Sequence, residues 1–459
     1  MLIVERSESI AETVHNETGK PKVDAFNTEV MSSVAAVKEY ERLMMKFIYE
    51  QKLDQSSMSM FTRFLRRTSY IRYLPLGVVA VISPYNFPFS IPFIETVAAV
   101  AAGNGVVLKP SSETPLSGEL IGELFKDAGF PDDLVMVIHG PGIGAALSVA
   151  GADKIIFTGS TEVGREIMKN ASVTLTPVTL ELGGKDAMIV LEDADIERAA
   201  DCATWGSFVN AGQVCAGIKR IFVHRSVYEE FKERFVKKTR TLKIGDGWND
   251  PDVSVGPMIN SRELERIVSV CRKAEEQNGR ILTGGKKLER KGYFFEPTVI
   301  EGVDHTSDIV RNEIFGPVVM LFPFSDENDT VTMAKDSDFA LGGSVWTQDL
   351  RKGKEIAFRL GSGTVDVNNS MYTFGLPATP WGGRGNSGFG ITHGELGFRE
   401  LMFPHHVHID RGRWKRDVWW MPYNEEKTSV QVEMIDTFFG SGKGKLKMLR
   451  KMLPILRKR

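Results

Sequence analysis

Hydrophobic residues in this chain gather in short runs that alternate with longer stretches of helical spacing. Runs rich in Val and Ile predict buried strands at 76–82, 105–108, 134–138 and 154–157. The stretches between them predict helices at 91–102, 114–128 and 142–150. Thr114 is placed to cap the second of these helices. Strands and helices in this repeated order indicate a parallel sheet that is covered on both faces.

The alternation starts again after Gly184 and predicts a second α/β domain, with the join near 182–184. Strands are expected at 187–191, 219–223, 318–323, 341–346 and 363–367, and helices at 196–210 and 227–242. The polar and interrupted segment 52–73 predicts a protruding hairpin. After Glu400 the alternation stops, and Trp414, Trp419 and Trp420 lie in a charge-rich stretch with the pattern of a loop. The sequence therefore predicts an α/β fold with two parallel-sheet domains.

The composition excludes several classes of protein. Of the 459 residues, 42% are hydrophobic and 25% are charged, which is typical of a globular chain with several domains. No apolar run approaches the roughly 18 residues that a membrane span needs. Cysteines at 202, 215 and 271 form no disulfide framework, and residues 1–20 lack the pattern of a secretory signal. We therefore expect a cytoplasmic protein, and no nucleic-acid partner is expected.

The net charge of −2 hides an asymmetry between the body and the tail of the chain. Eight basic residues and no acidic one lie within 443–459, so the rest of the chain carries a net charge of −10. Four leucines recur there at helical spacing, at 446, 449, 453 and 456. This pattern predicts a short basic amphipathic helix that Pro454 bends or ends. Such a tail makes peripheral contact with an anionic membrane, stays solvated, or docks on the acidic body of a neighbouring subunit.

Cys215 stands in a setting that favours reactivity. Gly212 and Gly217 flank it, and they allow a tight turn and let a substrate approach the sulfur. The alternative is that a lone cysteine after a helix is a buried small hydrophobic residue. No histidine lies nearby in the sequence, so the base for a nucleophile at this position must come from elsewhere.

Two further polar residues suit catalysis by their position. Glu181 ends an apolar strand before a Gly-Gly turn, so its carboxylate either caps that turn or faces a cleft between the domains. In a cleft, a raised pKa would let it deprotonate a water molecule. Asn86 lies in an extended loop between Pro84 and Pro88. Its amide either forms an Asx turn or donates to a developing oxyanion.

Other residues suit a dinucleotide. Lys109 lies at the carboxyl end of a predicted strand, where open α/β sheets bind ligands. Gly159 and Ser160 begin a predicted helix whose free N–H groups suit a pyrophosphate. Further along the chain, Glu313 offers an acid for ribose hydroxyls and Phe315 offers an aromatic ring.

Together these segments resemble the aldehyde dehydrogenase superfamily. Glu181-Leu182-Gly183-Gly184-Lys185 and Gly212-Gln213-Val214-Cys215 are similar to its two active-site signatures. The similarity extends from about Glu17 to Glu400, which is nearly the whole chain. It also covers Asn86, Lys109, Gly159-Ser160, 313–317, Asn368 and 380–383.

The resemblance implies non-acylating oxidation of an aldehyde to a carboxylic acid with NAD or NADP. It makes Cys215 the nucleophile that forms a thioester, with Asn86 holding the oxyanion and Glu181 activating water. The implied cofactor contacts are Ser83, Pro84, Lys109, Ser112, Gly159, Ser160, Gly183, Glu313 and Phe315. An apolar substrate tunnel is implied by Tyr85, Phe89, Trp205, Phe208 and Phe374, with no arginine evident beside them. No metal is implied.

The resemblance also assigns roles to the domains and predicts a homodimer or homotetramer. It implies a Rossmann-like cofactor domain at 1–182, with an oligomerisation hairpin at 52–73, and a catalytic domain at 183–397. A small β oligomerisation strand at 398–410 and a C-terminal extension at 411–459 follow. Family members carry several dozen residues before the segment that 17–21 matches, so early strands and a helix of the cofactor domain are expected to be missing.

Some positions leave alternatives open. Ser112 stands where NAD-preferring members often have a glutamate, which makes NADP acceptable, although Glu113 can partly restore the acid. The alternating histidines at 405, 406 and 408 suit an exposed strand better than a metal site. The competing functions are a catalytically silent structural or binding subunit and a CoA-acylating dehydrogenase, a class that typically lacks the glutamate represented by Glu181.

Overall fold

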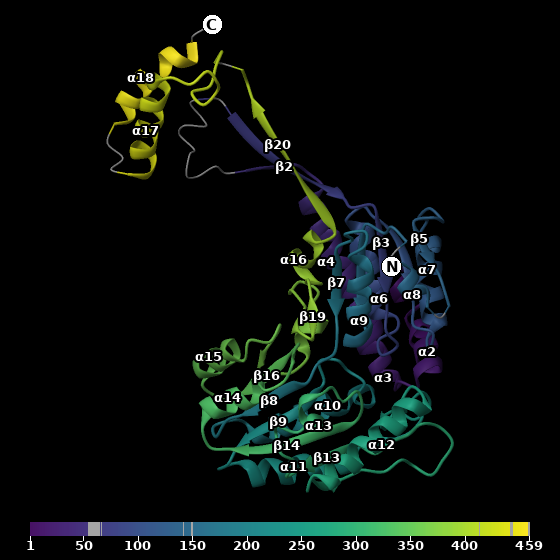
Figure 1. Ribbon diagram of the computed structural model, residues 1–459. Coiled ribbons are helices and arrows are strands. Elements are labelled where there is room, and N and C mark those ends of the chain that lie inside the picture. The colour runs from purple at the N-terminus through teal and green to yellow at the C-terminus, as the bar shows by residue number, and fades with distance from the viewer. Residues whose placement is uncertain are drawn as a thin grey trace. The chain divides into compact units, whose positions relative to one another are not determined.

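The structure is a computed structural model that describes residues 1–53, 65, 67–140, 142–147, 150–412, 414–440 and 444–457. These residues form two compact units, whose elements are labelled in Figure 1. The first unit consists of Met1–Met44 and Pro75–Met402. The second unit consists of Met45–Leu74 and Phe403–Arg459.

A six-stranded sheet in the first unit has the strand order β19-β7-β6-β3-β4-β5. Its strands are β3 (Val78–Ile82), β4 (Gly105–Lys109), β5 (Val135–Val137), β6 (Lys154–Thr158), β7 (Val178–Glu181) and β19 (Gly388–Phe389). Neighbouring strands are parallel except β19, which runs antiparallel to β7. The four strands expected between 76 and 158 are confirmed. Strand β6 is buried along its whole length, as expected for a parallel sheet covered on both faces.

Helices flank this sheet, and more helices precede it in the chain (Figure 1). The helices that precede β3 in the chain are α1 (Leu2–Glu5), α2 (Ser7–Thr18), α3 (Lys22–Ala25), the π-helix η1 (Phe26–Met31) and α4 (Ser32–Phe47). The helices that follow β3 are α6 (Ser90–Ala101), α7 (Pro115–Asp127), α8 (Ile143–Leu147) and α9 (Thr161–Ala171). The helices expected at 91–102 and 114–128 are confirmed as α6 and α7. The end of the helix expected at 142–150 lies partly outside the described residues.

The N-terminus of α7 is capped by a residue far away in the sequence. Thr114 occupies the N-cap position, as predicted, but its side chain forms no capping hydrogen bond. Instead the Glu17 carboxylate accepts from the backbone N–H of Leu116 at 2.6 Å and from that of Ser117 at 2.9 Å. A carboxylate satisfies these free N–H groups and also favours the positive end of the helix dipole. The expected role of Thr114 is therefore corrected.

A seven-stranded sheet follows Gly184, with the strand order β12-β13-β14-β9-β8-β16-β17. Its strands are β8 (Asp186–Val190), β9 (Ile218–His224), β12 (Arg280–Thr283), β13 (Thr298–Glu301), β14 (Val318–Phe324), β16 (Gly343–Trp346) and β17 (Asp366–Val367). Only β12 is antiparallel to its neighbour. The strands expected in this part of the chain are confirmed. Two small sheets pair β10 (Lys243–Ile244) with β11 (Val253–Val255), and β15 (Phe339–Ala340) with β18 (Arg384–Gly385).

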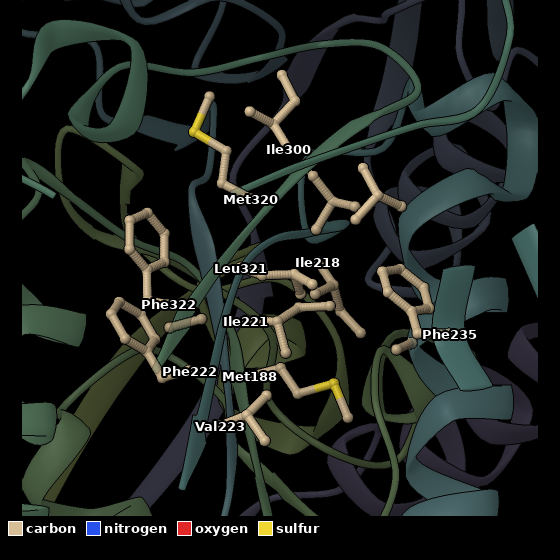
Figure 2. Packing of buried hydrophobic residues seen from close by; sticks show 14 of the residues in the cluster. Met188, Ile218, Ile221, Phe222, Val223, Phe235, Ile300, Met320, Leu321 and Phe322 are labelled. Atoms are coloured by element: carbon tan, nitrogen blue, oxygen red, sulfur yellow. The ribbon is translucent and has the colours of Figure 1, made fainter. Parts of the chain in front are cut away.

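The helices of this part are α10 (Ile196–Phe208), α11 (Tyr228–Thr241), α12 (Ser261–Glu276), α13 (Asp308–Arg311), α14 (Glu327–Lys335), α15 (Leu350–Leu360) and α16 (Gly394–Arg399), with short 3₁₀ segments η3 (Val209–Gly212) and η4 (Tyr372–Gly375). Figure 2 shows the core that they cover. Phe222 and Phe322 of the adjacent strands β9 and β14 stack on each other on one side of the sheet, and Phe235 of α11 lies on the other side. The sequence predicted α10 and α11 but not α12, α14 or α15. Strand β19 also lies within the expected catalytic range 183–397, yet it belongs to the first sheet.

The second unit contains a three-stranded sheet with the order β1-β2-β20. Its strands are β1 (Gln51–Lys52), β2 (Arg67–Pro75) and β20 (Met402–Asp410). The ends of the expected hairpin pair antiparallel, Gln51 with Ile71, whereas 54–64 and 66 lie outside the described residues. In the described part, Arg67 forms ion pairs with Asp417 at 2.5 Å and with Asp410 at 2.7 Å.

Two helices complete this unit, α17 (Glu425–Phe439) and α18 (Lys445–Arg457). Helix α18 confirms the expected helix in the basic tail, but the helix does not end at Pro454. Helix α17 was not predicted. Among the described residues, no helix has both the length and the apolar character that crossing a membrane requires.

Candidate active site

A cavity of about 210 Å³ in the first unit is lined by the ends of β6 and β7 and loops beside them, and by α12 and loops of the part that contains the seven-stranded sheet. Ten of its fifteen lining residues are among the seventeen site residues expected from the sequence. They are Pro84, Tyr85, Asn86, Gly159, Ser160, Glu181, Gly183, Cys215, Glu313 and Phe315. Segments that are more than two hundred residues apart in the chain therefore meet around one space.

The turn before Cys215 is strained and is held by side chains. Asn210 and Ala211 have left-handed φ values of 52° and 54°, which non-glycine residues rarely adopt. The Asn210 amide donates to the Asn86 carbonyl at 2.9 Å. The buried Lys219 ammonium donates to the Gly212 carbonyl at 2.7 Å. These bonds fix the backbone that presents Cys215 to the cavity.

The Cys215 side chain lies against an apolar group of residues. It packs, together with Phe374 and Met371, on the buried residues Ala216, Leu341 and Trp381. Burial raises the pKa of the Cys215 thiol above its usual range, and the charges of Asp186, Glu181 and Glu313 raise it further. The thiol is therefore neutral in this state, and it needs a base to become a nucleophile.

Glu181 ends β7 beside the cavity, as the pattern of its segment predicted. Its Oε1 accepts a hydrogen bond from the Thr392 hydroxyl at 3.2 Å, whereas its buried Oε2 has no partner among the described residues. Burial raises the Glu181 pKa from 4.5 to about 8, with a further contribution from the charge of Glu95. A carboxylate with an unpaired oxygen and a pKa near neutrality is suited to take a proton from water.

The two glycines after Glu181 are required by close packing. A Cβ on Gly183 would lie 2.6 Å from the Glu313 carboxyl carbon. A Cβ on Gly184 would lie 2.2 Å from the Cys215 carbonyl oxygen. Glycine at both positions therefore lets Glu181, Glu313 and Cys215 approach one another.

Asn86 is anchored on both its backbone and its side chain. Its carbonyl accepts from the Lys20 ammonium at 3.0 Å, and Lys20 forms a buried ion pair with Glu29. The Asn86 amide nitrogen donates to the Gln213 carbonyl at 3.0 Å. Because an amide has two N–H groups, this bond orients Asn86 and leaves a second donor for a ligand in the cavity.

The cavity fits part of a dinucleotide. Thr158, Gly159 and Ser160 line it at the N-terminus of α9, where free N–H groups suit a phosphate. Glu313 accepts one bond from the Gly184 N–H at 3.3 Å and has further acceptor capacity for hydroxyl groups. Tyr85 meets Phe315 edge to face at 6.0 Å between ring centroids, beside the same space.

The other expected cofactor residues lie outside the cavity wall. The Ser83 N–H donates to the Lys109 carbonyl at 3.0 Å, which joins the ends of β3 and β4. Burial lowers the pKa of Lys109. Ser112 is exposed. Glu113 accepts from the Asn260 amide at 3.0 Å, so it is engaged with the N-terminus of α12.

The five aromatic residues expected to form a tunnel lie in different surroundings. Phe374 lies beside Cys215, and Tyr85 lines the cavity. Phe89 is fully buried and stacks on Phe93, and Phe208 is buried and stacks on Phe235, so neither is placed to line a tunnel. Trp205 is 46% exposed and lies outside the cavity wall.

Helix α12 adds cavity residues that sequence reasoning missed. Arg262, Glu263 and Arg266 line the space together with Tyr85, although no arginine was expected near the aromatic residues. Arg266 donates to the Glu313 carbonyl at 3.1 Å. The available signal was the helical spacing of the buried residues Leu264, Ile267, Cys271 and Ala274. Thr158 and Leu182 are the other unexpected lining residues.

The histidines at 405, 406 and 408 lie on β20, as the strand interpretation predicted. Their side chains are exposed, and His406 and His408 flank Val407 along that strand. No group of three potential ligands suited to a metal ion occurs within the described ranges.

Comparison with known proteins places the chain among similar sequences and structures. The sequence pattern of the Aldehyde dehydrogenase family matches residues 1–407. The chain is 34% identical over 439 residues to a 4,4'-diapolycopene aldehyde oxidase of Methylomonas sp, covering 95% of this chain and 81% of that protein. The NAD⁺ complex of an aldehyde dehydrogenase from Bacillus cereus has a TM-score of 0.84 at 34% identity, covering 89% of this chain and 82% of that one. An NADP-dependent enzyme of E. coli has a TM-score of 0.83 at 31% identity, covering 89% and 83%.

Proposed function

Because the chain belongs to the aldehyde dehydrogenase family and is an NAD(P)-dependent oxidoreductase, we propose that it oxidises an aldehyde through a thioester on Cys215. The observation that carries this proposal is the meeting of Cys215, Glu181 and Asn86 in one cavity wall. The same wall contains Glu313 and the N-terminus of α9, which suit a dinucleotide.

Each residue has a distinct role in the proposed reaction. After a base has taken the proton of the Cys215 thiol, the thiolate adds to the aldehyde carbon, and the free N–H of the Asn86 amide stabilises the oxyanion that forms. The bound nicotinamide would accept a hydride and leave a thioester on Cys215. Glu181 then takes a proton from water at its unpaired Oε2, and the resulting hydroxide releases the carboxylic acid.

We further propose an apolar aldehyde as the substrate. The surroundings of Cys215 support this, because Met371 and Phe374 pack around it on Leu341 and Trp381. Phe374 also belongs to a second apolar group with Phe87. An alkyl or polyene chain gains free energy by leaving water for such a surface.

The test combines a substrate panel with loss of the nucleophile. Purified protein is mixed with NAD or NADP and with apolar, polar and acidic aldehydes, and reduced cofactor is followed by its absorbance. We expect turnover that is fastest with apolar aldehydes and is abolished by Cys215→Ala, while the variant still binds the cofactor. Equal turnover by the variant would remove Cys215 from this role. No turnover by the wild type with any aldehyde would favour a silent subunit, and turnover that requires CoA would favour the acylating class.

A homodimer or homotetramer remains our expectation for the assembly. Phe403, Val407 and Ile409 are exposed and occupy alternating positions of β20, which places them on one face of the strand. Such a face supports pairing with another copy of the chain. Sedimentation equilibrium measures the mass of the assembly formed by the wild type and by Val407→Lys.

A further inference from the structure

Charge is divided unequally between the two units. Residues 45–74 and 403–459, which make up the second unit, contain 19 Lys and Arg and 8 Asp and Glu, a net charge of +11. The rest of the chain contains 38 basic and 51 acidic residues, a net charge of −13. The second unit is therefore strongly basic, although the whole chain is nearly neutral.

The helix pair α17 and α18 has its own small core, and Figure 1 shows the two helices side by side. Met452, Ile455 and Leu456 of α18 are buried against Val430 of α17 and Val418. Most of the apolar side chains in the described part of the basic tail are therefore covered by protein, whereas Leu446 is 65% exposed. The buried side chains are not available to lie directly in a membrane.

Helix α17 has a second apolar face that no described residue covers. Val432, Ile435 and Phe439 are 63%, 62% and 70% exposed. With 3.6 residues per turn they form one stripe, opposite the buried Val430 and the half-buried Met434. A stripe of three large apolar side chains in solvent marks a binding surface.

An aromatic loop is held next to the first turn of α17. Trp420, Met421 and Tyr423 are exposed. The buried Lys427 of α17 donates to the carbonyls of Trp420 and Pro422, the latter at 2.8 Å. Trp and Tyr combine an apolar body with a polar tip, a property that suits the boundary between water and lipid.

Basic residues of α18 accompany these apolar groups. Lys447 and Lys451 pair with Glu433 at 2.8 Å and 2.6 Å, which neutralises an acid on the flank of α17. Lys445 and Arg450 are exposed on α18. Helix α17 also carries the exposed acids Glu425 and Asp436 on the side of the stripe, so the positive charge that attracts anionic lipid comes from α18 and from the unit as a whole.

We propose that the second unit docks on an anionic lipid bilayer through the outer face of α17 and the loop 420–423. The net charge of +11 on the second unit favours an anionic bilayer as the partner of this face, because it attracts anionic lipid headgroups. This inference does not depend on the proposed catalytic mechanism. It concerns where the protein resides, and its test measures binding without turnover.

The test is co-sedimentation of the full chain with vesicles of phosphatidylcholine alone or mixed with phosphatidylserine, at low and high salt. Three variants are compared: Val432→Ser/Ile435→Ser/Phe439→Ser, Lys445→Glu/Arg450→Glu, and the control Phe358→Ser. The control removes an equally exposed aromatic side chain from α15 in the other unit. Thermal melting and sedimentation equilibrium accompany each variant, so that unfolding or a changed assembly is recognised.

We expect the wild type and Phe358→Ser to pellet with the phosphatidylserine vesicles at low salt and to be released by high salt. For each of the other two variants, the ratio of vesicle-bound to free protein should fall by roughly tenfold or more. The melting temperature should stay unchanged. The proposal would be overturned if the wild type did not pellet, or if neither variant changed the pelleting. It would also be overturned if the wild type pelleted equally with vesicles of phosphatidylcholine alone. Loss of oligomers in the α17 variant without any lipid binding would also overturn it and would assign this face to a second copy.

Discussion

The substitution Glu181→Gln separates the two halves of the proposed reaction. Glutamine keeps the size of the side chain and an oxygen that can accept the 3.2 Å bond from Thr392. It removes the basicity of the buried Oε2, which has no partner among the described residues. Hydride transfer needs no base at this position once the thiohemiacetal has formed on Cys215, whereas hydrolysis of the thioester does. The variant should therefore accumulate acyl-enzyme.

The magnitude follows from the role of a general base and from the pKa of Glu181. Loss of a positioned base slows a step by roughly 10²–10⁴-fold. With a pKa of about 8, the wild type should hydrolyse its thioester faster as the pH rises and should reach a plateau above pH 8. Glu181→Gln should have no such inflection in this step, because an amide does not titrate there.

The same substitution should change stability with a defined sign. Burial raises the Glu181 pKa from 4.5 to about 8, so between these values the folded protein holds a proton that the unfolded chain has released. The free energy of unfolding therefore falls as the pH rises through this window, by on the order of 5 kcal/mol for this group. Glutamine does not titrate in this range, so the variant does not undergo this fall in the free energy of unfolding. The variant should gain stability relative to the wild type from pH 5 to pH 9.

Rapid-quench experiments measure the burst of reduced cofactor, and mass spectrometry of the quenched protein detects the acyl group on the Cys215 peptide. Urea unfolding at several pH values measures the free energy of unfolding for both proteins. A variant that is impaired in turnover but shows no added mass on Cys215 would refute the role of Glu181 in hydrolysis. A difference in stability that does not change with pH would refute its buried, raised-pKa state.

Three further predictions test the surroundings of the site. Glu95→Gln removes a charge that raises the Glu181 pKa, so the midpoint of the pH profile for thioester hydrolysis should move to lower pH; an unmoved midpoint would show that the two groups do not interact. Ser112→Glu should raise the ratio of kcat/KM for NAD to that for NADP by roughly tenfold, or about 1.4 kcal/mol. The reason is that Glu113 is bonded to Asn260 and so does not supply the carboxylate that accepts the ribose 2′-hydroxyl of NAD. An unchanged ratio would show that the 2′-phosphate is recognised by other residues. Gly184→Ala places a Cβ 2.2 Å from the Cys215 carbonyl oxygen and should lower kcat/KM by roughly 10²-fold with the cofactor still bound in a fluorescence titration, whereas near-normal kinetics would show that this contact relaxes freely.

Much of the fold was accessible from local pattern. Strands such as β3 and β6 are buried on both faces, so they appear in the sequence as continuous runs of Val, Ile and Ala between helical stretches. Helix α12 was missed although its apolar residues recur with helical spacing and its opposite side is charged, a pattern that was open to sequence reasoning. Helix α17 was missed because it has apolar residues on two opposite faces, which removes the contrast that identifies an amphipathic helix.

The residues that carry the proposed chemistry were also visible in the sequence, because they lie in short motifs whose glycines and prolines have local reasons. Cys215 follows a turn that includes Gly212, and Glu181 precedes two glycines. The aromatic tunnel was not accessible in this way. A phenylalanine in a core and a phenylalanine in a tunnel have the same pattern, and only packing placed Phe208 on Phe235 and Phe374 beside Cys215.

The sequence by itself therefore determined the parallel-sheet elements and the identity of the catalytic candidates, since both depend on neighbours within a few residues. The tertiary structure decided which distant residues contact these elements and candidates. Glu17 caps α7 in place of Thr114, and Arg266 reaches Glu313, through contacts between segments far apart in the chain. The tertiary structure also decided that Met452, Ile455 and Leu456 of the basic tail are covered while a face of α17 is exposed. Which of two apolar faces is buried depends on the partner that packs against it, and that partner is set by the folded chain and not by local periodicity.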